Sequence, residues 1–239
     1  MQNKGTALVT GGAKRLGEDI ALRLAENGYN IALHYNTSKD AADETAAVIR
    51  DKGVSCELVQ SNFAAMEDVR GFMDKVFSLC PGCNVLINNA SIFEDSRLLD
   101  TEEEFFDRHF QINFKTPFFL TRDFARRCQD GHVINIIDTK AVRTVTKYFA
   151  YTMTKKALYE FTKMAAKELA PNIRVNGVGP GVILPPPGEN ESYLEARKQE
   201  LPLRRHGDKE SISSSVLFLL QNPFITGHCL LVDGGEHLK

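Results

Sequence analysis

Short apolar runs alternate along the chain with stretches whose apolar residues recur every three or four positions. The short runs predict strands buried on both faces, because polar residues rarely interrupt them. They cover residues 6–9, 30–34, 55–59, 84–87, 132–137, 174–178 and 229–232. The periodic stretches predict helices between the strands, at residues 15–27, 39–52, 66–79, 102–128, 150–170 and 209–220.

This alternation predicts an α/β fold in which a doubly wound, Rossmann-type parallel sheet of about seven strands carries helices on both faces. Thr101 and Glu104 have the spacing of a capping box at the start of the fourth predicted helix. We expect residues 1–239 to form a single domain, because no repeat, low-complexity tract or linker divides the sequence. A proline-rich segment, "VILPPPGENES", begins at Val182 and predicts a loop.

Composition narrows the possible partners. The chain has 239 residues, of which 43% are hydrophobic, so it can bury a sizeable core. A formal charge of −2 argues against a general nucleic-acid binder. The apolar runs are too short to span a membrane, and no basic, hydrophobic leader opens the sequence. We therefore expect a cytoplasmic protein with no nucleic-acid or membrane partner.

Cys80 and Cys83 form a C-x-x-C motif, but its position does not favour redox or metal chemistry. The pair closes a predicted helix, whereas a reactive pair normally opens one, where the helix dipole lowers the thiol pKa. No second C-x-x-C or suitably spaced histidine pair completes a zinc site. We expect ordinary cysteines around a turn and no metal.

A glycine-rich turn, "TGGAKRLG" at residues 10–17, joins the first predicted strand to the first predicted helix. It is not a P-loop, because Glu18 and Asp19 stand where that motif has Lys and Ser/Thr. It also lacks the literal G-x-G-x-x-G fingerprint. Its backbone N–H groups and the helix start can nevertheless hold a pyrophosphate.

Further motifs follow in a fixed order. "YTMTK" places Tyr151 and Lys155 on one helix face, and Asp138 ends a strand thirteen residues earlier. "NNAS" begins at Asn88 after another strand. The chain resembles the short-chain dehydrogenase/reductase family along essentially its whole length. The family pattern, T-G-x-x-x-G-x-G, N-N-A-G, Ser and Y-x-x-x-K, is matched by Thr10, Gly11, Gly17, Asn88, Asn89, Ala90, Tyr151 and Lys155.

The tyrosine and lysine are expected to form an acid/base pair. An ammonium about 4–5 Å from a phenol favours the phenolate by about 3–4 kcal/mol at an effective dielectric near ~20. This lowers the tyrosine pKa by about 2–3 before desolvation opposes it. Tyr151 could then exchange a proton near neutrality. The resemblance also implies a catalytic Asn113.

Three departures from the family pattern resemble its pteridine reductase branch, T-G-x-x-x-R-x-G. Arg15 and Ser91 replace glycines and Asp138 replaces serine, while Phe93 follows in "NNASIF". The branch implies that the arginine lies by the cofactor phosphates and reaches the pterin. It further implies that the phenylalanine stacks on the pterin, that Ser91 hydrogen-bonds the substrate, and that Asp138 and Tyr151 handle the proton.

The charge of Asp138 also bears on which substrate the site can reduce. A carboxylate destabilises the oxyanion formed from a ketone, whereas it stabilises the iminium-like nitrogen formed from a C=N bond. We therefore expect reduction of a dihydropterin or dihydrofolate-like substrate. Three alternatives stay open: Asp138 as a simple turn cap, a carbonyl reductase such as one acting on 3-oxoacyl thioesters, and a non-catalytic nucleotide sensor.

The expected cofactor is NADPH/NADP. The second strand ends without the acidic residue that selects NAD, and the cations Lys14 and Arg15 stand nearby to bind a 2′-phosphate. Arginine is usual in the pteridine branch where Thr37 stands, a departure that would weaken this preference. The cofactor residues expected from the turn, this strand end and the resemblance are Gly11, Lys14, Arg15, Leu16, His34, Tyr35, Asn36, Thr37, Ser38, Asn62, Asn89, Ala90, Tyr151, Lys155, Pro180, Gly181 and Val182.

The resemblance also implies a homotetramer paired through the long helices around residues 105–124 and 159–169. The phenylalanines of the first could equally be internal core: Phe105, Phe106, Phe110, Phe114 and Phe118. The proline-rich segment is expected to be a substrate loop, around residues 182–200, that is mobile in the free enzyme and closes over the substrate.

Overall fold

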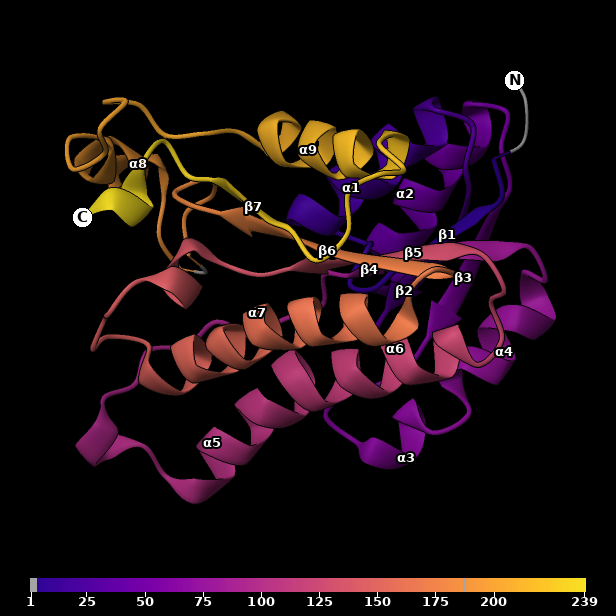
Figure 1. Cartoon of the computed structure of the whole chain (residues 1–239). Coiled ribbons are helices and arrows are strands. Elements are labelled where there is room, and N and C mark those ends of the chain that lie inside the picture. The colour runs from indigo at the N-terminus through magenta and orange to yellow at the C-terminus, as the bar shows by residue number, and fades with distance from the viewer. Residues whose placement is uncertain (1–3, 187) are drawn as a thin grey trace.

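A parallel sheet of seven strands forms the centre of the structure (Figure 1). The structure is a computed structural model that describes residues 4–186 and 188–239, so Pro187 of the predicted loop lies outside the described residues. The sheet order is β3-β2-β1-β4-β5-β6-β7, with every neighbouring pair parallel, which confirms the predicted fold class. The strands are β1 (Thr6–Val9), β2 (Asn30–Tyr35), β3 (Cys56–Gln60), β4 (Cys83–Asn88), β5 (Gly131–Ile136), β6 (Ile173–Pro180) and β7 (Cys229–Val232).

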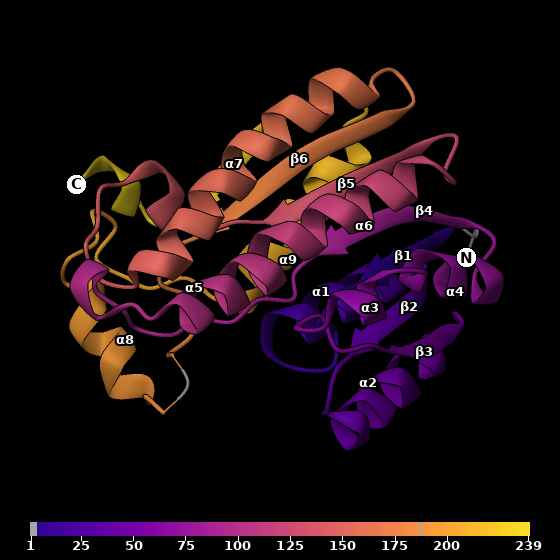
Figure 2. The same cartoon turned by 90° about the horizontal axis from the view of Figure 1, so that it is seen from below.

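Helices cover both faces of the sheet, as Figures 1 and 2 show from two directions. One face carries α1 (Arg15–Glu26), α2 (Lys39–Asp51) and α9 (Lys209–Gln221). The other carries α3 (Met66–Val69), α4 (Phe72–Leu79), α5 (Glu103–Phe110), α6 (Thr116–Ala125) and α7 (Phe149–Leu169). Along β1, Ala7 and Val9 face one hydrophobic core while Leu8 faces the other, because successive side chains of a strand point to opposite faces.

Two predicted helices are interrupted. Gly71, at φ +74°, separates α3 from α4 within the helix expected at 66–79. Within the helix expected at 102–128, α5 and α6 are joined by a π-helical turn, η2 (Gln111–Lys115). The predicted capping box is wrong, because the Thr101 hydroxyl donates to the Arg97 carbonyl and the helix start has no side-chain cap.

The proline-rich segment leads into a helix that the sequence pattern did not predict. This helix, α8 (Glu191–Lys198), is capped by the Asn190 side chain, which accepts the Ser192 N–H. The polar end of the expected loop is therefore partly helical. Across the described residues, none of the helices combines the length and the apolar character that crossing a bilayer would require.

The C-x-x-C cysteines lie at the amino-terminal edge of the sheet, far from the ends of the strands where ligands bind in this fold. Both thiols are buried, and burial raises the pKa of Cys83 to about 12. A thiol with so high a pKa is a poor nucleophile, in keeping with the expectation of ordinary cysteines.

The direction of the strands gathers the predicted site residues at one edge. The glycine-rich turn follows β1, the Asn-Asn-Ala-Ser segment follows β4, Asp138 follows β5, and Gly181 follows β6. The strand order runs outward in both directions from β1 and β4, and the crevice at such a switch point is where doubly wound sheets bind ligands.

Candidate active site

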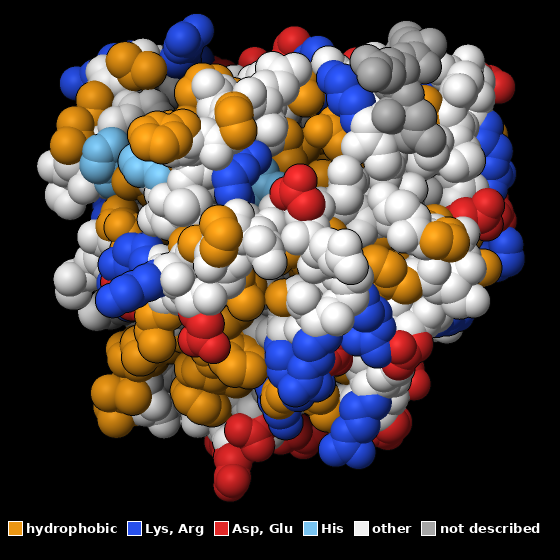
Figure 3. Space-filling view, turned by 45° about the vertical axis from the view of Figure 1, so that its right-hand side comes forward, with side chains coloured by type: hydrophobic (Ala, Val, Ile, Leu, Met, Phe, Trp, Pro, Cys, Tyr) orange, Lys and Arg blue, Asp and Glu red, His pale blue; other side chains and the backbone are white. Residues whose placement is uncertain are grey.

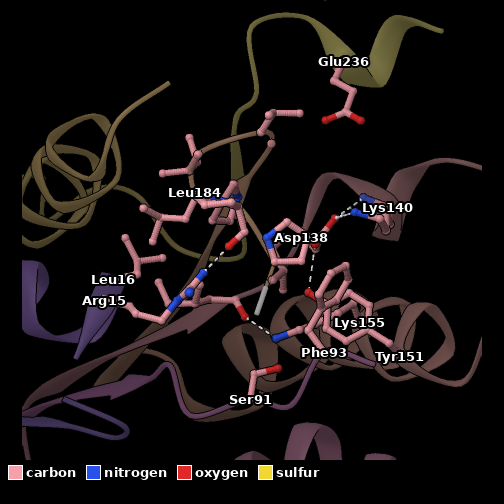
Figure 4. Close-up of a pocket in the computed structure, with 18 of the residues that line it drawn as sticks. Arg15, Leu16, Ser91, Phe93, Asp138, Lys140, Tyr151, Lys155, Leu184 and Glu236 are labelled. Carbon is pink, nitrogen blue, oxygen red and sulfur yellow. Dashed lines mark hydrogen bonds and ion pairs between the residues drawn. The ribbon is translucent and has the colours of Figure 1, made fainter. Parts of the chain in front are cut away.

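A cavity of about 330 Å³ opens at this edge of the sheet (Figure 4). Its wall combines the first turn of α1, the segment after β4, the segment after β5, one face of α7 and the proline-rich segment. The predicted site residues among its lining are Arg15, Leu16, Asn89, Ser91, Phe93, Asp138, Tyr151, Lys155, Pro180, Gly181 and Val182. Residues more than 160 positions apart thus meet in one space.

A hydrogen bond between Tyr151 and Asp138 lies at the centre of the cavity wall. The Tyr151 hydroxyl donates to Asp138 Oδ2 over 2.8 Å. The other carboxylate oxygen accepts the backbone N–H of Lys140 over 2.7 Å and so caps the 3-10 turn η3 (Thr139–Val142). Asp138 is therefore a turn cap and a site residue at once, which joins two interpretations that the sequence left as alternatives.

Burial of Tyr151, reinforced by the negative charge of Asp138 and by their hydrogen bond, raises the pKa of the phenol well above its usual value. We expected the neighbouring ammonium to lower this pKa before desolvation opposed it, and the pKa is instead raised. Desolvation of a fully enclosed phenol outweighs the attraction of a cation at this distance. Tyr151 is thus held as a phenol that can donate its proton.

Lys155 lies one turn further along the same face of α7, as predicted. Its ammonium nitrogen donates to the Ile136 carbonyl over 2.9 Å and lies 5.6 Å from the centre of the Tyr151 ring. Burial lowers the pKa of Lys155 to about 8, against the opposing attraction of Asp138. The amine therefore stays mostly protonated at neutral pH and loses its charge under mildly alkaline conditions.

Asn113 lies in the π-helical turn and clamps the segment after β4. Its Oδ1 accepts from the Ile92 N–H over 2.9 Å and from the Ser91 hydroxyl over 3.1 Å, while its Nδ2 donates to the Ile92 carbonyl. Single π turns often occur at functional sites, and here the turn aims a buried amide at the cavity wall. These contacts show that Asn113 positions the segment after β4. A direct role of Asn113 in catalysis stays a prediction.

Phe93 contributes an aromatic platform beside the tyrosine. Its ring stacks on Tyr148, with centres 4.2 Å apart, and meets the Tyr151 ring edge-on at 4.7 Å. One Phe93 face is thus already covered by an aromatic ring. Tyr148, which the sequence pattern did not single out, adopts a left-handed backbone at φ 57° just before α7.

The glycine-rich turn has the shape of a phosphate cradle. Gly11 has φ +62°, and a Cβ on Gly17 would lie 2.1 Å from the Gly11 carbonyl oxygen, so both positions need glycine. Lys14, the residue before α1, forms no side-chain cap, which leaves N–H groups of the first turn available to an anion. A cavity of about 280 Å³ lies against this turn, with Asn89 and Ala90 on its far wall.

His34 supports this turn from beneath. Its ring is buried, accepts the Gly11 N–H at Nδ1 over 3.0 Å, and stacks on Phe63. Burial lowers the pKa of His34 to about 4, so the ring is neutral and supplies no positive charge for a phosphate. The structure gives His34 a positioning role through Gly11, and its expected cofactor contact stays a prediction.

The other residues predicted near a 2′-phosphate lie beyond the end of β2. Asn36 and Thr37 are exposed, Tyr35 and Ser38 are half-buried, and the Asn36 amide reaches Asn62 Oδ1 at 3.5 Å. The ends of β2 and β3 thus form one polar shelf beside the glycine-rich turn. These cofactor contacts stay predictions.

Arg15 connects the two halves of the cavity. It is the first residue of α1, its φ is 56°, and its guanidinium donates to the Pro185 carbonyl over 2.7 Å. A left-handed backbone is natural for the glycine that the family usually has here and is strained for arginine. The side chain thus ties the phosphate-binding turn to the proline-rich segment.

Several lining residues escaped prediction because their segments carry no motif. They are Lys140 in η3, Tyr193 and Arg197 in α8, and Glu236 in the 3-10 turn η4 (Glu236–Leu238). Glu236 is buried and accepts from Arg143 over 2.6 Å and from Arg197 over 3.1 Å. The chain's last turn therefore anchors α8 against η3.

Comparison with known proteins places this site in a family. The sequence pattern of a family described as Enoyl-(Acyl carrier protein) reductase matches residues 11–237. A short-chain type dehydrogenase/reductase of Picea abies is 30% identical over 96% of this chain and 91% of that protein. The chain belongs to the short-chain dehydrogenase/reductase family of oxidoreductases.

Relatives within the short-chain dehydrogenase/reductase family differ in their named activities. The 3-oxoacyl-[acyl-carrier-protein] reductase FabG of Staphylococcus epidermidis is 33% identical over 98% of this chain and 99% of its own length. Pteridine reductase 1 of Leishmania tarentolae is 33% identical over 97% and 96%. The structure of FolM Alternative dihydrofolate reductase 1 from Brucella suis, in complex with NADP, is similar with a TM-score of 0.95 and 35% identity over 100% and 97%.

We predict that Arg15→Gly and Arg15→Ala differ in stability. Both lose the bond to Pro185, but only glycine relieves the left-handed backbone, so Arg15→Gly should be more stable than Arg15→Ala by about 1 kcal/mol. Urea unfolding at one protein concentration measures the difference. Amide hydrogen exchange at residues 182–184, just before Pro185, should be faster than wild type in both variants. Equal stabilities of the two variants would contradict backbone strain at Arg15. Unchanged exchange would contradict the proposal that the Arg15–Pro185 hydrogen bond holds the proline-rich segment.

Proposed function

We propose that this protein is an NADPH-dependent reductase that transfers hydride to a C=N bond of a dihydropterin or dihydrofolate-like substrate. The observation that carries the proposal is the 2.8 Å hydrogen bond from the Tyr151 hydroxyl to Asp138. The carboxylate favours the phenol form of Tyr151 and places a negative charge where a substrate nitrogen would gain a proton. Both effects suit an imine, whose reduction passes through positive charge on nitrogen.

The substrate is proposed to lie on Phe93, with Ser91 and Arg15 at its polar edge. Phe93 already packs against Tyr148, so a bound pterin would extend an existing aromatic stack. Arg15 and Ser91 both line the cavity. Tyr151 then turns its single O–H from Asp138 to the substrate nitrogen and donates that proton, while the Asp138 carboxylate stabilises the positive charge on the nitrogen.

NADPH fits the residues beside this space and would supply the hydride when bound. The glycine cradle and the start of α1 suit its pyrophosphate, and Lys14 and Arg15 suit a 2′-phosphate, because no carboxylate precedes Asp40 after β2. Lys155 and the segment 180–182 line the nicotinamide side. Loss of one charge-assisted hydrogen bond in Arg15→Gly should weaken NADPH binding about 10- to 100-fold.

A 3-oxoacyl thioester reductase is the second candidate, and the FabG relatives favour it. Its reaction builds negative charge on a carbonyl oxygen beside Tyr151. Asp138 would oppose that charge at hydrogen-bond distance from the proton donor. The Asp138 carboxylate therefore distinguishes the two candidate functions, because it favours C=N reduction and opposes carbonyl reduction.

We predict that wild-type protein with NADPH reduces dihydrobiopterin or dihydrofolate with a higher kcat/KM than an acetoacetyl thioester. Asp138→Ser should lower pterin turnover and raise the relative rate on the thioester. Tyr151→Phe should lower both by about 10²- to 10⁴-fold, because the proton donor is lost, while NADPH still binds. Initial rates of NADPH oxidation measure all three. Faster pterin reduction by Asp138→Ser would contradict the iminium argument.

We also propose that the protein is a homotetramer. Of the phenylalanines along α5, η2 and α6, the five predicted as an interface or core stripe are not buried and so are not internal core: Phe105, Phe106, Phe110, Phe114 and Phe118. Phe118 is 40% exposed and Met164 on α7 is 71% exposed, and Figure 3 shows hydrophobic side chains gathered on the lower part of one face. A second copy would bury this surface.

Light scattering should give four times the 26.7 kDa mass of one chain. Phe118→Glu combined with Met164→Glu should reduce that mass, because charge opposes burial of the patch. Met153→Glu, an exposed methionine near the start of α7, serves as a comparison for the effect of added charge. A monomeric wild type would contradict the proposal.

Two further expectations, a single NADP-binding domain over residues 1–239 and a cytoplasmic location, stay predictions. So does the closure of the substrate loop at residues 182–200, whose described part is tied to Arg15 at Pro185.

A further inference from the structure

Lys140 stands on the far side of Asp138 from Tyr151, and the three side chains form a row (Figure 4). The ammonium nitrogen of Lys140 lies 3.5 Å from Asp138 Oδ1, while Tyr151 occupies Oδ2. Exposure falls along the row, from 22% for the Lys140 side chain to 15% for Asp138 and 5% for Tyr151. The row therefore leads from the solvent side of the cavity to the buried phenol.

We propose that Lys140 is the positioning residue through which protons enter the site: it passes a proton to Asp138, which returns it to Tyr151 after each turnover. The inference rests on the proposed function in one respect, that Tyr151 is the proton donor to the substrate. It names a residue that neither the family pattern nor the expected chemistry singles out.

The proton balance of the reaction requires such a supply. Each reduction adds a hydride and one proton to the substrate, and NADPH provides the hydride. The proton leaves the Tyr151 O–H bond, so a phenolate remains beside a carboxylate. An N–H proton of Lys140 moves to Asp138, the carboxyl group gives a proton to the phenolate, and the neutral Lys140 amine takes one proton from water. The row then returns to its starting state.

Lys155 is less suited to this particular task. Lys155 as a whole is only 3% exposed, so water has little access to it. Its ammonium donates a hydrogen bond to the Ile136 carbonyl. Among the described residues Lys140 forms one ion pair, with Asp138; its side chain lines the cavity, and its ammonium lies 5.3 and 5.9 Å from the centres of the Phe93 and Tyr148 rings. It can therefore exchange protons with water that enters the cavity.

The chain offers a matched control in Lys147. The ammonium of Lys147 also lies near the Tyr148 ring, 5.2 Å from its centre, and pairs with Asp95 at 3.5 Å. It shares the cation and the aromatic neighbour of Lys140 but has no contact with Asp138. A change in general charge or in Tyr148 packing would affect both lysines, whereas loss of proton delivery affects Lys140 alone.

The test is steady-state kinetics of Lys140→Met, Lys140→Arg, Lys140→Ala and Lys147→Met with NADPH and the best substrate of the wild type. We expect kcat to fall about 10- to 100-fold in the three Lys140 variants, with the NADPH Kd from fluorescence quenching unchanged. Arginine should not restore kcat, because a guanidinium holds its charge but does not release its proton. Small primary amines should restore Lys140→Ala in proportion to their concentration, and Lys147→Met should match the wild type.

Wild-type kcat in Lys140→Met, full activity in Lys140→Arg, or no rescue by amines would overturn the proposal. Full activity in the arginine variant would make the role purely electrostatic. The series also separates this inference from the proposed function. A wild type that reduces only the acetoacetyl thioester contradicts the C=N assignment, and the same variants on that substrate still test Lys140.

Discussion

The hydrogen bond between the Tyr151 phenol and the Asp138 carboxylate is the interaction on which the rest of the site depends. It joins α7 to the end of β5, and it favours the phenol form of Tyr151, the proposed proton donor. Burial and the carboxylate both raise the pKa of Tyr151, so the phenol form is favoured at every physiological pH. Asp138 is half-buried beside the buried phenol, and two cations offset its charge: Lys140, whose ammonium lies 3.5 Å from Oδ1, and Lys155, whose charged form Asp138 favours.

The surrounding fold holds this pair through contacts that are individually modest. Asn113, placed by a π turn, fixes the segment that carries Ser91 and Phe93. His34, neutral because it is buried, fixes the glycine-rich turn through Gly11. Arg15 has an unfavourable left-handed backbone conformation, and its guanidinium hydrogen-bonds the proline-rich segment at the Pro185 carbonyl. Each contact crosses between strand ends that the parallel sheet brings together.

Much of this arrangement could be predicted from the sequence, because buried parallel strands are nearly continuous apolar runs and their carboxyl ends share one edge. The predictions that failed concern features that leave no periodic pattern of apolar residues in the sequence. Gly71 breaks one helix by its backbone conformation, and η2 inserts a π turn whose residues continue the helical pattern. Lys140 escaped notice because an isolated lysine in a short turn carries no motif. The direction of the Tyr151 pKa shift was mistaken because desolvation depends on complete enclosure, which spacing along a helix does not reveal.

The most direct test of this account is a measurement of the Tyr151 pKa. The protein has six tyrosines, so ¹³Cζ-tyrosine labelling gives a spectrum in which Tyr151 can be assigned by its loss in Tyr151→Phe. The account predicts that the Tyr151 signal of the ligand-free wild type keeps its phenol position through pH 10, and that Asp138→Asn lowers its pKa. A Tyr151 signal that titrates between pH 7 and 8 in the wild type, as an ammonium-dominated site would give, would contradict it.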